Sequence, residues 1–367
     1  YYNGILPKVV AKVGEKVKAG SVLMIDKNRP EIKFVSPVSG EVTAVNRGEK
    51  RKVLSIVVKP DAQIEYEEFG KKNVASLQGA EVKEVLLNAG MWPFIKQRPY
   101  DIVAAPLDTP RDIFVSAFYS APLAPNFDFI VKGQEADFQT GLNALAKLTN
   151  GKVYVGVRSG SVVSGMKGVE IVEVEGPHPA ANVGVQINHI KPVNKGEVNP
   201  ADVIVIGRLF NKGVADFSRM VAITGSETTE RGYVKTISGC TIKSLVNGKV
   251  LGQEHIRIIS GNVLTGTKVN MDGYLGAYDN QITVIPEGDE THEFLGFAMP
   301  RFNQFSASHS YFSWLGTSKE YVIDARIKGG KRAMIMSNEY DKVFPMDIYP
   351  EYLLKAIIAF DIDKMQN

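Results

Sequence analysis

The stretch P-K-V-V-A-K-V-G-E-K-V-K-A-G-S-V-L at residues 7–23, followed by F-V-S-P-V-S-G-E-V at 34–42, decides how the start of the chain folds. Gly14 and Gly20 bracket a first hairpin and Gly40 closes a second, because glycine tolerates the positive φ that tight turns need. Between the turns, apolar residues supply the expected inward faces: Val9, Val13, Val17, Val22, Leu23 and Ile25. The stretch predicts a small domain of short hairpins.

This pattern resembles half of a biotinyl/lipoyl-type barrel-sandwich, a β-fold that normally carries a swinging cofactor on a lysine. The tip here reads M-I-D-K-N-R-P at 24–30, which is not the Met-Lys-Met-like turn that presents an acceptor lysine. Lys27 is the candidate lipoyl or biotinyl site, but the mismatch favours a solvated turn lysine. We therefore expect a barrel-sandwich domain reused inside a larger protein rather than a carrier.

Bulk composition narrows the class of protein. The 367 residues suffice for two to four domains, and 44% hydrophobic with 23% charged residues is ordinary for a globular protein. A net charge of +3 is too small to indicate nucleic-acid binding or a polybasic membrane anchor. The apolar run at 352–360 is broken by Lys355 and predicts a packed helix rather than a membrane span. We expect no signal peptide and a cytoplasmic protein, docked on a membrane partner.

The thiol and imidazole groups argue against metal chemistry. Cys240 is the single cysteine, so the chain can hold neither a disulfide nor an iron–sulfur cluster, and its apolar, strand-like surroundings predict a buried small side chain. The five histidines make none of the common zinc-binding spacings: His178, His189, His255, His292 and His309. We predict no metal site and no catalytic residue.

The chain divides into four pieces: a barrel-sandwich domain at 1–66, a Rossmann-like α/β domain at 67–222, a β-grasp (ubiquitin-like) domain at 223–294, and a small, partly helical C-terminal region at 295–367. Helices are predicted at 82–89, ending at Gly90, at 135–148, near 241–245 and from Pro350 onward. Strands are predicted at 53–58, 112–117, 127–131, 153–157, 169–174, 202–206, 256–259 and 281–285, and a basic hairpin at 326–332. Strands alternating with helices favour a mostly parallel sheet in the second piece.

Several long strings resemble one family. They are V-N-R-G-E-K-R-K-V-L at 45–54, E-G-P-H-P-A at 175–180, R-I-I-S-G-N-V-L-T-G at 257–266, and G-Y-L-G at 273–276 with N-Q-I-T-V at 280–284. On these residues the chain is similar to the A subunit of the bacterial sodium-translocating NADH:quinone oxidoreductase over nearly its whole length. Members of that family are longer at both ends, so we expect the first domain to be N-terminally incomplete and the last region to stop before a cysteine-containing segment.

The resemblance implies a component of a translocase that couples electron transfer from NADH to ubiquinone with sodium export. The family is related to the flavin- and NADH-binding subunit of complex I and to the corresponding Rnf subunit, which bind flavin through a loop like G-x-x-G-R-G-G-A-G-F-P. The corresponding segment here, 88–100, keeps only Gly90. We expect no redox cofactor in this chain, with FAD, FMN, riboflavin and the iron–sulfur cluster of the complex on other subunits.

The resemblance also associates this subunit with quinone. A quinone headgroup needs a flat apolar slot and donors to its carbonyl oxygens. The segment 92–100 offers both, so we predict Trp92 and Phe94 as slot walls, and Arg98 and Tyr100 as carbonyl donors. The alternative is that these residues only fill the space left by the flavin. His178, held between Pro177 and Pro179, is predicted to be structural.

The sequence leaves three candidate functions for this chain. The first is a cofactor-free, peripheral subunit on the cytoplasmic face of the bacterial inner membrane, contacting the other subunits (above all a membrane subunit) and ubiquinone or another quinone. The second is an assembly module without a ligand site, favoured by exposed apolar surface in the first domain and no ligand-sized pocket near Trp92. The third is an autonomous NADH-dependent flavoenzyme, against which the missing glycine loop argues.

Overall fold

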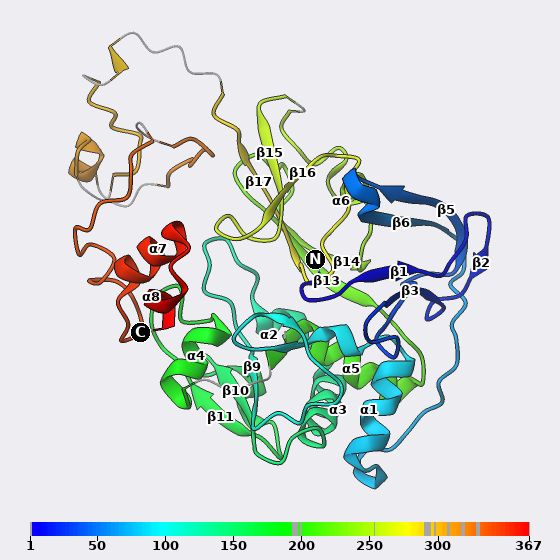
Figure 1. The fold of residues 1–367 in the computed structure, drawn as a ribbon. Helices are drawn as coiled ribbons and strands as arrows, with labels where there is room; N and C mark the ends of the chain where they lie inside the picture. Colours follow the sequence, from blue (N-terminus) through cyan, green and yellow to red (C-terminus); the bar gives the residue numbers. More distant parts are fainter. Residues whose placement is uncertain are drawn as a thin grey trace.

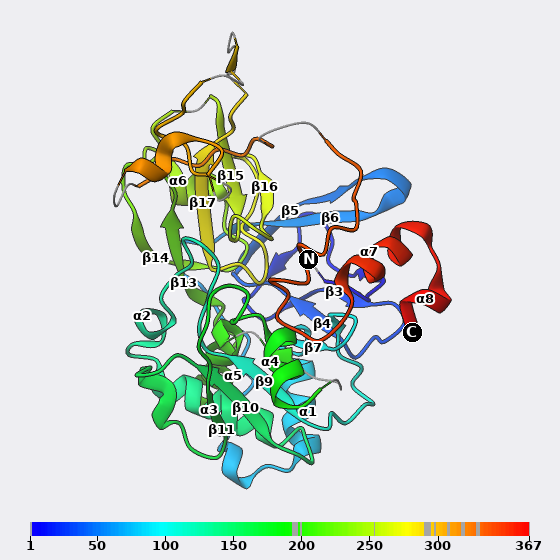
Figure 2. The same cartoon turned by 90° about the vertical axis from the view of Figure 1, so that its left-hand side faces the viewer.

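The computed structural model of the chain describes residues 2–192, 197, 198, 200–252, 254–289, 295, 296, 299–306, 309–316, 320–327 and 331–366. A six-stranded sheet with its helices forms one layer of the molecule. Two three-stranded sheets near the N-terminus (blue) and a five-stranded sheet (yellow-green) lie above it in both views (Figures 1 and 2). Tyr2 lies between these units: its ring packs against Phe34 of the first unit and Tyr278 near the five-stranded sheet, and the next residue, Asn3, accepts a hydrogen bond from the Val103 amide of the six-stranded sheet.

The first unit consists of two antiparallel sheets. One has the order β1-β3-β4 and the other β2-β5-β6, formed by β1 (Pro7–Val9), β2 (Lys16–Val17), β3 (Val22–Asp26), β4 (Lys33–Val35), β5 (Gly40–Arg47) and β6 (Val53–Pro60). The turns at Gly14, Gly20 and Gly40 all have positive φ, as predicted. Lys27 is an exposed residue just after β3.

The inward face of the first unit matches the prediction only in part, since Val9, Val22 and Ile25 are half-buried. Val17 and Leu23 are buried with Ala11 and Val42 in a small core. Val13, however, is 63% exposed, because it lies in the turn before β2 rather than on a strand. Ile32 and Phe34 of this unit enter the main core of the α/β unit instead, so the first unit has a small core of its own and also shares the main one.

The six-stranded sheet has the order β11-β10-β9-β12-β7-β8. Its strands are β7 (Ile95–Gln97), β8 (Ile102–Val103), β9 (Ile113–Ser116), β10 (Val153–Val157), β11 (Glu170–Glu173) and β12 (Glu197–Val198). The first four in this order pair in parallel, and β7 and β8 extend the sheet antiparallel. The strands predicted at 112–117, 153–157 and 169–174 are confirmed as β9, β10 and β11. The helices are η2 (Val74–Ser76), α1 (Gly79–Asn88), η3 (Trp92–Phe94), α2 (Phe127–Val131), α3 (Glu135–Ala146), η4 (Val162–Gly165), α4 (Val183–Ile190) and α5 (Pro200–Lys212).

Two segments predicted as strands are helices. The segment 127–131 forms α2, because the Asn126 side chain caps it by accepting a hydrogen bond from the Phe129 amide. The segment 202–206 belongs to α5, whose residues Val203 to Ile206 are all buried. Over so short a buried apolar run, periodicity cannot separate a helix from a strand, so the β-branched residues Val203 to Ile206 imitate a strand. The helix predicted at 135–148 is confirmed as α3.

Glycines allow α3 and α5 to pack at close range. A Cβ atom on Gly207 of α5 would lie 1.7 Å from the carbonyl oxygen of Asp137. One on Gly141 of α3 would lie 2.2 Å from the carbonyl oxygen of Val203. Neither neighbour is a side chain that could rotate away, so both positions require glycine.

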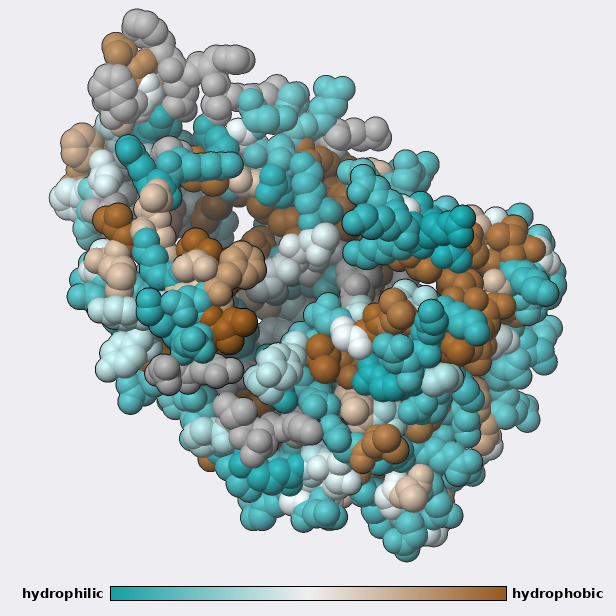
Figure 3. Space-filling model, in the orientation of Figure 1, coloured by the Kyte–Doolittle hydropathy of each residue, from teal (hydrophilic) through white to brown (hydrophobic). Residues whose placement is uncertain are grey.

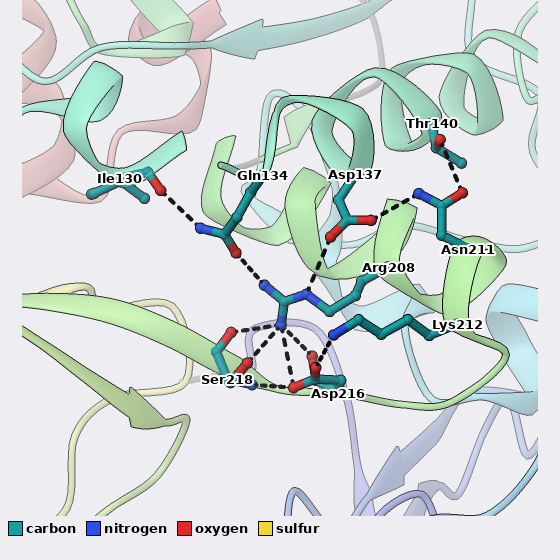
Figure 4. A network of polar contacts seen from close by, with 9 residues as sticks. All are labelled: Ile130, Gln134, Asp137, Thr140, Arg208, Asn211, Lys212, Asp216 and Ser218. Atoms are coloured by element: carbon teal, nitrogen blue, oxygen red, sulfur yellow. Dashed lines mark hydrogen bonds and ion pairs between the residues drawn. The ribbon is translucent and has the colours of Figure 1, made fainter. Parts of the chain in front are cut away.

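A buried guanidinium connects this helix pair to the next unit (Figure 4). Arg208 of α5 donates through Nη2 to Gln134 Oε1 at 2.6 Å and lies 3.7 Å from the Asp137 carboxylate. Through Nη1 it donates to the carbonyl oxygens of Asp216 at 2.9 Å and Ser218 at 2.8 Å. Partial burial raises the pKa of Asp216, but the hydrogen bonds from Ser218 and the nearby Arg208 and Lys212 outweigh it and lower the pKa to about 2. The network fixes the chain where it leaves α5 and enters the five-stranded sheet.

The five-stranded sheet has the order β14-β13-β17-β15-β16. It contains β13 (Ser218–Thr224), β14 (Gly232–Ile237), β15 (Ile256–Ser260), β16 (Thr267–Val269) and β17 (Gln281–Pro286), with α6 (Ile242–Val246) packed on it. β13 and β17 pair in parallel, and the other neighbours are antiparallel. The predicted short helix is confirmed as α6, which Thr241 caps through its side chain. The strands predicted at 256–259 and 281–285 are confirmed as β15 and β17.

The C-terminal region contains η6 (Phe312–Leu315), α7 (Pro350–Ala359) and α8 (Ile362–Gln366). The helix predicted from Pro350 is confirmed, but the prediction that its apolar run is packed is wrong. Ile358 is 65% exposed, and apolar surface gathers around this part of the molecule (Figure 3). In α7 the buried residues are Pro350, Glu351 and Ala356, so the helix buries one narrow stripe and leaves the rest of the run in solvent. Residues 328–330 of the predicted basic hairpin lie outside the described residues.

Candidate functional site

The segment predicted to contact quinone begins where α1 ends. Gly90 turns the chain with a positive φ and comes so close to the first unit that a Cβ atom would lie 2.5 Å from Val35. The next residues form η3, in which Trp92 is only 3% exposed. Its indole Nε1 donates a hydrogen bond to the carbonyl oxygen of Ala104 at 2.8 Å, which satisfies the buried donor and fixes the ring.

Phe94 is also buried but faces a different unit from Trp92. Its ring packs against Phe217 at 6.1 Å and Tyr278 at 6.2 Å between centroids. The hydroxyl of Tyr278 donates to the carbonyl oxygen of Pro93 at 2.7 Å, so η3 is tied to the five-stranded sheet. Phe94 therefore belongs to the contact between units.

The two predicted donors lie away from the indole. Tyr100 is 77% exposed in the turn between β7 and β8. Arg98 is half-buried, with its Nη2 3.9 Å from the Asp101 carboxylate. The structure thus places the four candidates on one short segment but does not gather them around one cavity.

Two hollows lie beside Lys83, and Trp92 lines only the first of them. The first is a cavity of about 30 Å³, room for roughly one water molecule, between the indole and the loop at 104–110. The second is an open groove of about 430 Å³ between α1 and the end of α3, on the outer side of the cavity. Lys83 and Leu148 line both hollows and so form the wall between them. The sequence prediction missed Lys83, because one lysine on an amphipathic helix is normally a solvated residue.

A second polar site lies between the α/β unit and the five-stranded unit. Asp202, in the first turn of α5, accepts a hydrogen bond from Arg219 of β13 at 3.1 Å, and both side chains are buried. Burial outweighs the attraction of Arg219 and Lys96 and raises the pKa of Asp202 to about 7. Nearby, Asn280 donates to the hydroxyl of Tyr119, whose pKa burial also raises.

These two contacts occupy the carboxyl edge of the parallel strands. Asp202 follows β12, and Tyr119 follows β9. Because β9 and β12 are parallel neighbours, both residues lie at the edge where open α/β sheets usually bind ligands. The five-stranded sheet supplies Arg219 and Asn280 to the same edge, and no sequence pattern indicated this pairing.

The histidines and the cysteine take part in local contacts. His178 Nδ1 lies 3.0 Å from Ser120 Oγ, and His189 Nε2 lies 2.6 Å from the carbonyl oxygen of Pro345. Cys240 lies in the turn after β14 rather than on a strand; it is half-buried, and burial raises the pKa of its thiol. His292 lies outside the described residues. Among the residues that are described, no three His, Cys, Asp or Glu side chains come together to hold a metal ion.

No helix in the described part of the chain combines the length and apolar character needed to cross a bilayer. The architecture instead defines a class of protein: a barrel-sandwich unit and an α/β unit with a shared core, followed by a smaller five-stranded unit. Proteins of this class are multidomain modules. In this one, buried polar contacts of Arg208 and of Asp202 with Arg219 join the α/β unit to the five-stranded unit.

Comparison with known proteins identifies the family. Residues 1–61 match the model of the NqrA N-terminal barrel-sandwich hybrid domain, residues 77–215 that of the NqrA second alpha/beta domain, and residues 220–271 that of the NQRA C-terminal domain. The A subunit of the Na(+)-translocating NADH-quinone reductase from Vibrio anguillarum is 37% identical over the whole chain and 83% of its own length. Those from Hahella chejuensis and Yersinia pestis are 36% and 34% identical with the same coverage.

The chain therefore belongs to the NqrA family, the A subunits of the Na(+)-translocating NADH-quinone reductases. Among solved structures, an NAD+-reducing [NiFe]-hydrogenase aligns with 49% of this chain and 41% of its own, with 11% identity and a TM-score of 0.35. A structural similarity this weak supports no conclusion about this chain.

Proposed function

We propose that this chain, as a subunit of a sodium-translocating NADH-quinone reductase, contributes a quinone contact at Trp92 and carries no redox cofactor of its own. The observation that carries the proposal is the indole of Trp92, which its hydrogen bond to the carbonyl oxygen of Ala104 fixes against a cavity that shares Lys83 and Leu148 with the groove. A fixed aromatic face with a lysine ammonium nearby has the chemistry that a quinone ring and its carbonyl oxygens require.

The absence of a flavin from this chain is proposed on two grounds. The segment after α1 has only Gly90 where a phosphate cradle needs several glycines. The carboxyl edge between β9 and β12 is taken up by the contacts of Asp202 with Arg219 and of Tyr119 with Asn280. The residues present therefore do not fit a flavin phosphate there. FAD, FMN, riboflavin and the iron–sulfur cluster of the complex then belong to other subunits.

The strand orders support the finer fold assignments that we propose. The order β11-β10-β9-β12 is 3-2-1-4 when the four parallel strands are numbered along the chain, as in Rossmann-like sheets. The order β14-β13-β17-β15-β16 is 2-1-5-3-4 on the same basis, with α6 packed on the sheet, as in a β-grasp domain. We further propose that the chain sits peripherally on the cytoplasmic face of the inner membrane, against a membrane subunit.

Tryptophan emission tests the quinone contact, because Trp92 and Trp314 are the two tryptophans of the chain. In a Trp314→Phe background, ubiquinone-1 is expected to quench the emission of Trp92 with saturation, since a 3% exposed indole is shielded from collisions. In a Trp92→Phe chain, the 53% exposed Trp314 should show only linear, non-saturating quenching. Linear quenching in both chains would contradict the proposal.

The assembly module remains the second candidate, and two observations favour it. The cavity beside Trp92 is too small for a quinone headgroup as it stands. The first unit also exposes apolar side chains, which gather over its sheets (Figure 3): Leu6, Val10, Val13 and Leu54. Saturable quenching of Trp92 separates the two functions, because a module without a ligand site gives none.

A further inference from the structure

Lys83 lines both hollows, the cavity beside Trp92 and the groove between α1 and the end of α3. It projects from the middle of α1 and is half-buried, and its Nζ lies 5.9 Å from the centroid of the Trp92 ring. The ammonium donates to the carbonyl oxygen of Pro106 at 2.6 Å. On the outer side, the groove of about 430 Å³ reaches the same side chain.

The size of each hollow decides what it admits. The cavity of about 30 Å³ holds roughly one water molecule, whereas the groove of about 430 Å³ falls within the range of about 300–1,000 Å³ for small-molecule sites. A planar ring in the groove can reach the Trp92 face only after the Lys83 side chain swings aside. That motion requires no backbone change, because the lysine stem is flexible and its head is held by one backbone carbonyl.

We propose that the groove between α1 and the end of α3 admits the quinone headgroup, and that Lys83 exchanges its bond to Pro106 for one to a quinone carbonyl oxygen. This inference rests on the proposed function, and it replaces Arg98 and Tyr100 as the carbonyl donors. An ammonium has three N–H donors, so one hydrogen bond to an acceptor inside the groove substitutes directly for the one that is broken. When the Lys83 side chain swings out of the cavity wall, the two hollows join. The quinone ring can then lie against the Trp92 indole.

Three variants in the full chain test the inference, with ubiquinone-1 as the probe in equilibrium dialysis. Lys83→Met keeps the apolar stem but removes the donor, and Ala80→Phe narrows the groove from an exposed position near the start of α1. Lys132→Met, an exposed lysine beyond α2 that lines neither hollow, is the matched control. We expect both groove variants to raise the Kd at least about tenfold, and the control to stay within about twofold of the unmodified chain.

The outcomes separate this inference from the proposed function. If the unmodified chain binds no ubiquinone-1, the proposed function fails and the inference with it. If it binds but Lys83→Met and Ala80→Phe bind equally well, the groove assignment is overturned while a quinone contact elsewhere on the chain stands. An effect of Lys83→Met without one of Ala80→Phe also overturns the groove as the route of entry. Because Ala80 is exposed, its variant keeps the test informative even if Lys83→Met disturbs folding.

Discussion

Replacing Gly207 by alanine is expected to lower the free energy of unfolding of the α/β unit by at least about 3 kcal/mol. The added Cβ would lie 1.7 Å from the carbonyl oxygen of Asp137 on the neighbouring helix. A backbone atom cannot rotate away, so α3 and α5 must separate along the buried face that includes Val203 and Leu209. The free-energy cost of this overpacking exceeds the gain of about 1 kcal/mol that alanine brings over glycine in a helix interior.

Denaturant titration followed by far-UV circular dichroism measures this effect. Gly165→Ala is the matched control, since its φ is not positive and a Cβ there meets nothing within 4 Å. The control should unfold at the same denaturant concentration as the unmodified chain. If Gly207→Ala also unfolds there, the close packing of α3 on α5 is wrong.

Arg208→Met is expected to lower the free energy of unfolding by about 3–5 kcal/mol, because it removes one partner from a buried charge network. Its guanidinium contacts Gln134, Asp137, Asp216 and Ser218 (Figure 4). Methionine fills a similar space but donates nothing to Gln134 or to the carbonyl oxygens of Asp216 and Ser218. It also takes the guanidinium away from Asp137 and Asp216, which keep their contacts to Asn211 and Lys212. Arg208→Lys should recover little of the loss, since a compact ammonium cannot reproduce the fork of donors.

Lys212→Met provides the control for Arg208→Met. Lys212 pairs with the same Asp216 carboxylate at 2.9 Å, but its side chain is half exposed, so its removal should cost less than about 1 kcal/mol. Both variants are compared by the denaturant midpoint and by protease cleavage in the linker at 213–217. Equal losses of stability in Arg208→Met and Lys212→Met would show that the Arg208 network does not hold α5 to the five-stranded sheet.

Local signals in the sequence predicted much of the fold. The turn glycines of the first unit, the amphipathic α3 and the short helix α6 are short-range features, and each appears where expected. The prediction failed at α5, because the short, wholly buried run from Val203 to Ile206 cannot be told from a strand by its periodicity. It also failed at α7, because a run that is apolar apart from Lys355 does not reveal which stripe is buried.

The candidate site was less predictable than the fold. Trp92 and Arg98 are close in sequence, yet a 3₁₀ turn and a strand send them in different directions, which no local pattern encodes. Lys83 meets Trp92 only because the loop at 104–110 closes behind α1. Arg219 of the five-stranded sheet pairs with Asp202 of the α/β unit. Such contacts depend on tertiary packing and carry no signal in a single sequence.

The central claim is that this chain contacts quinone without carrying electrons itself. The most direct test is steady-state kinetics of the whole reductase assembled with Trp92→Phe. We predict that the KM for ubiquinone-1 rises by about tenfold, while NADH oxidation with ferricyanide as acceptor and the yield of assembled complex stay unchanged. A parallel loss of both activities, or an unchanged KM for quinone, would contradict the claim and leave the chain as an assembly module.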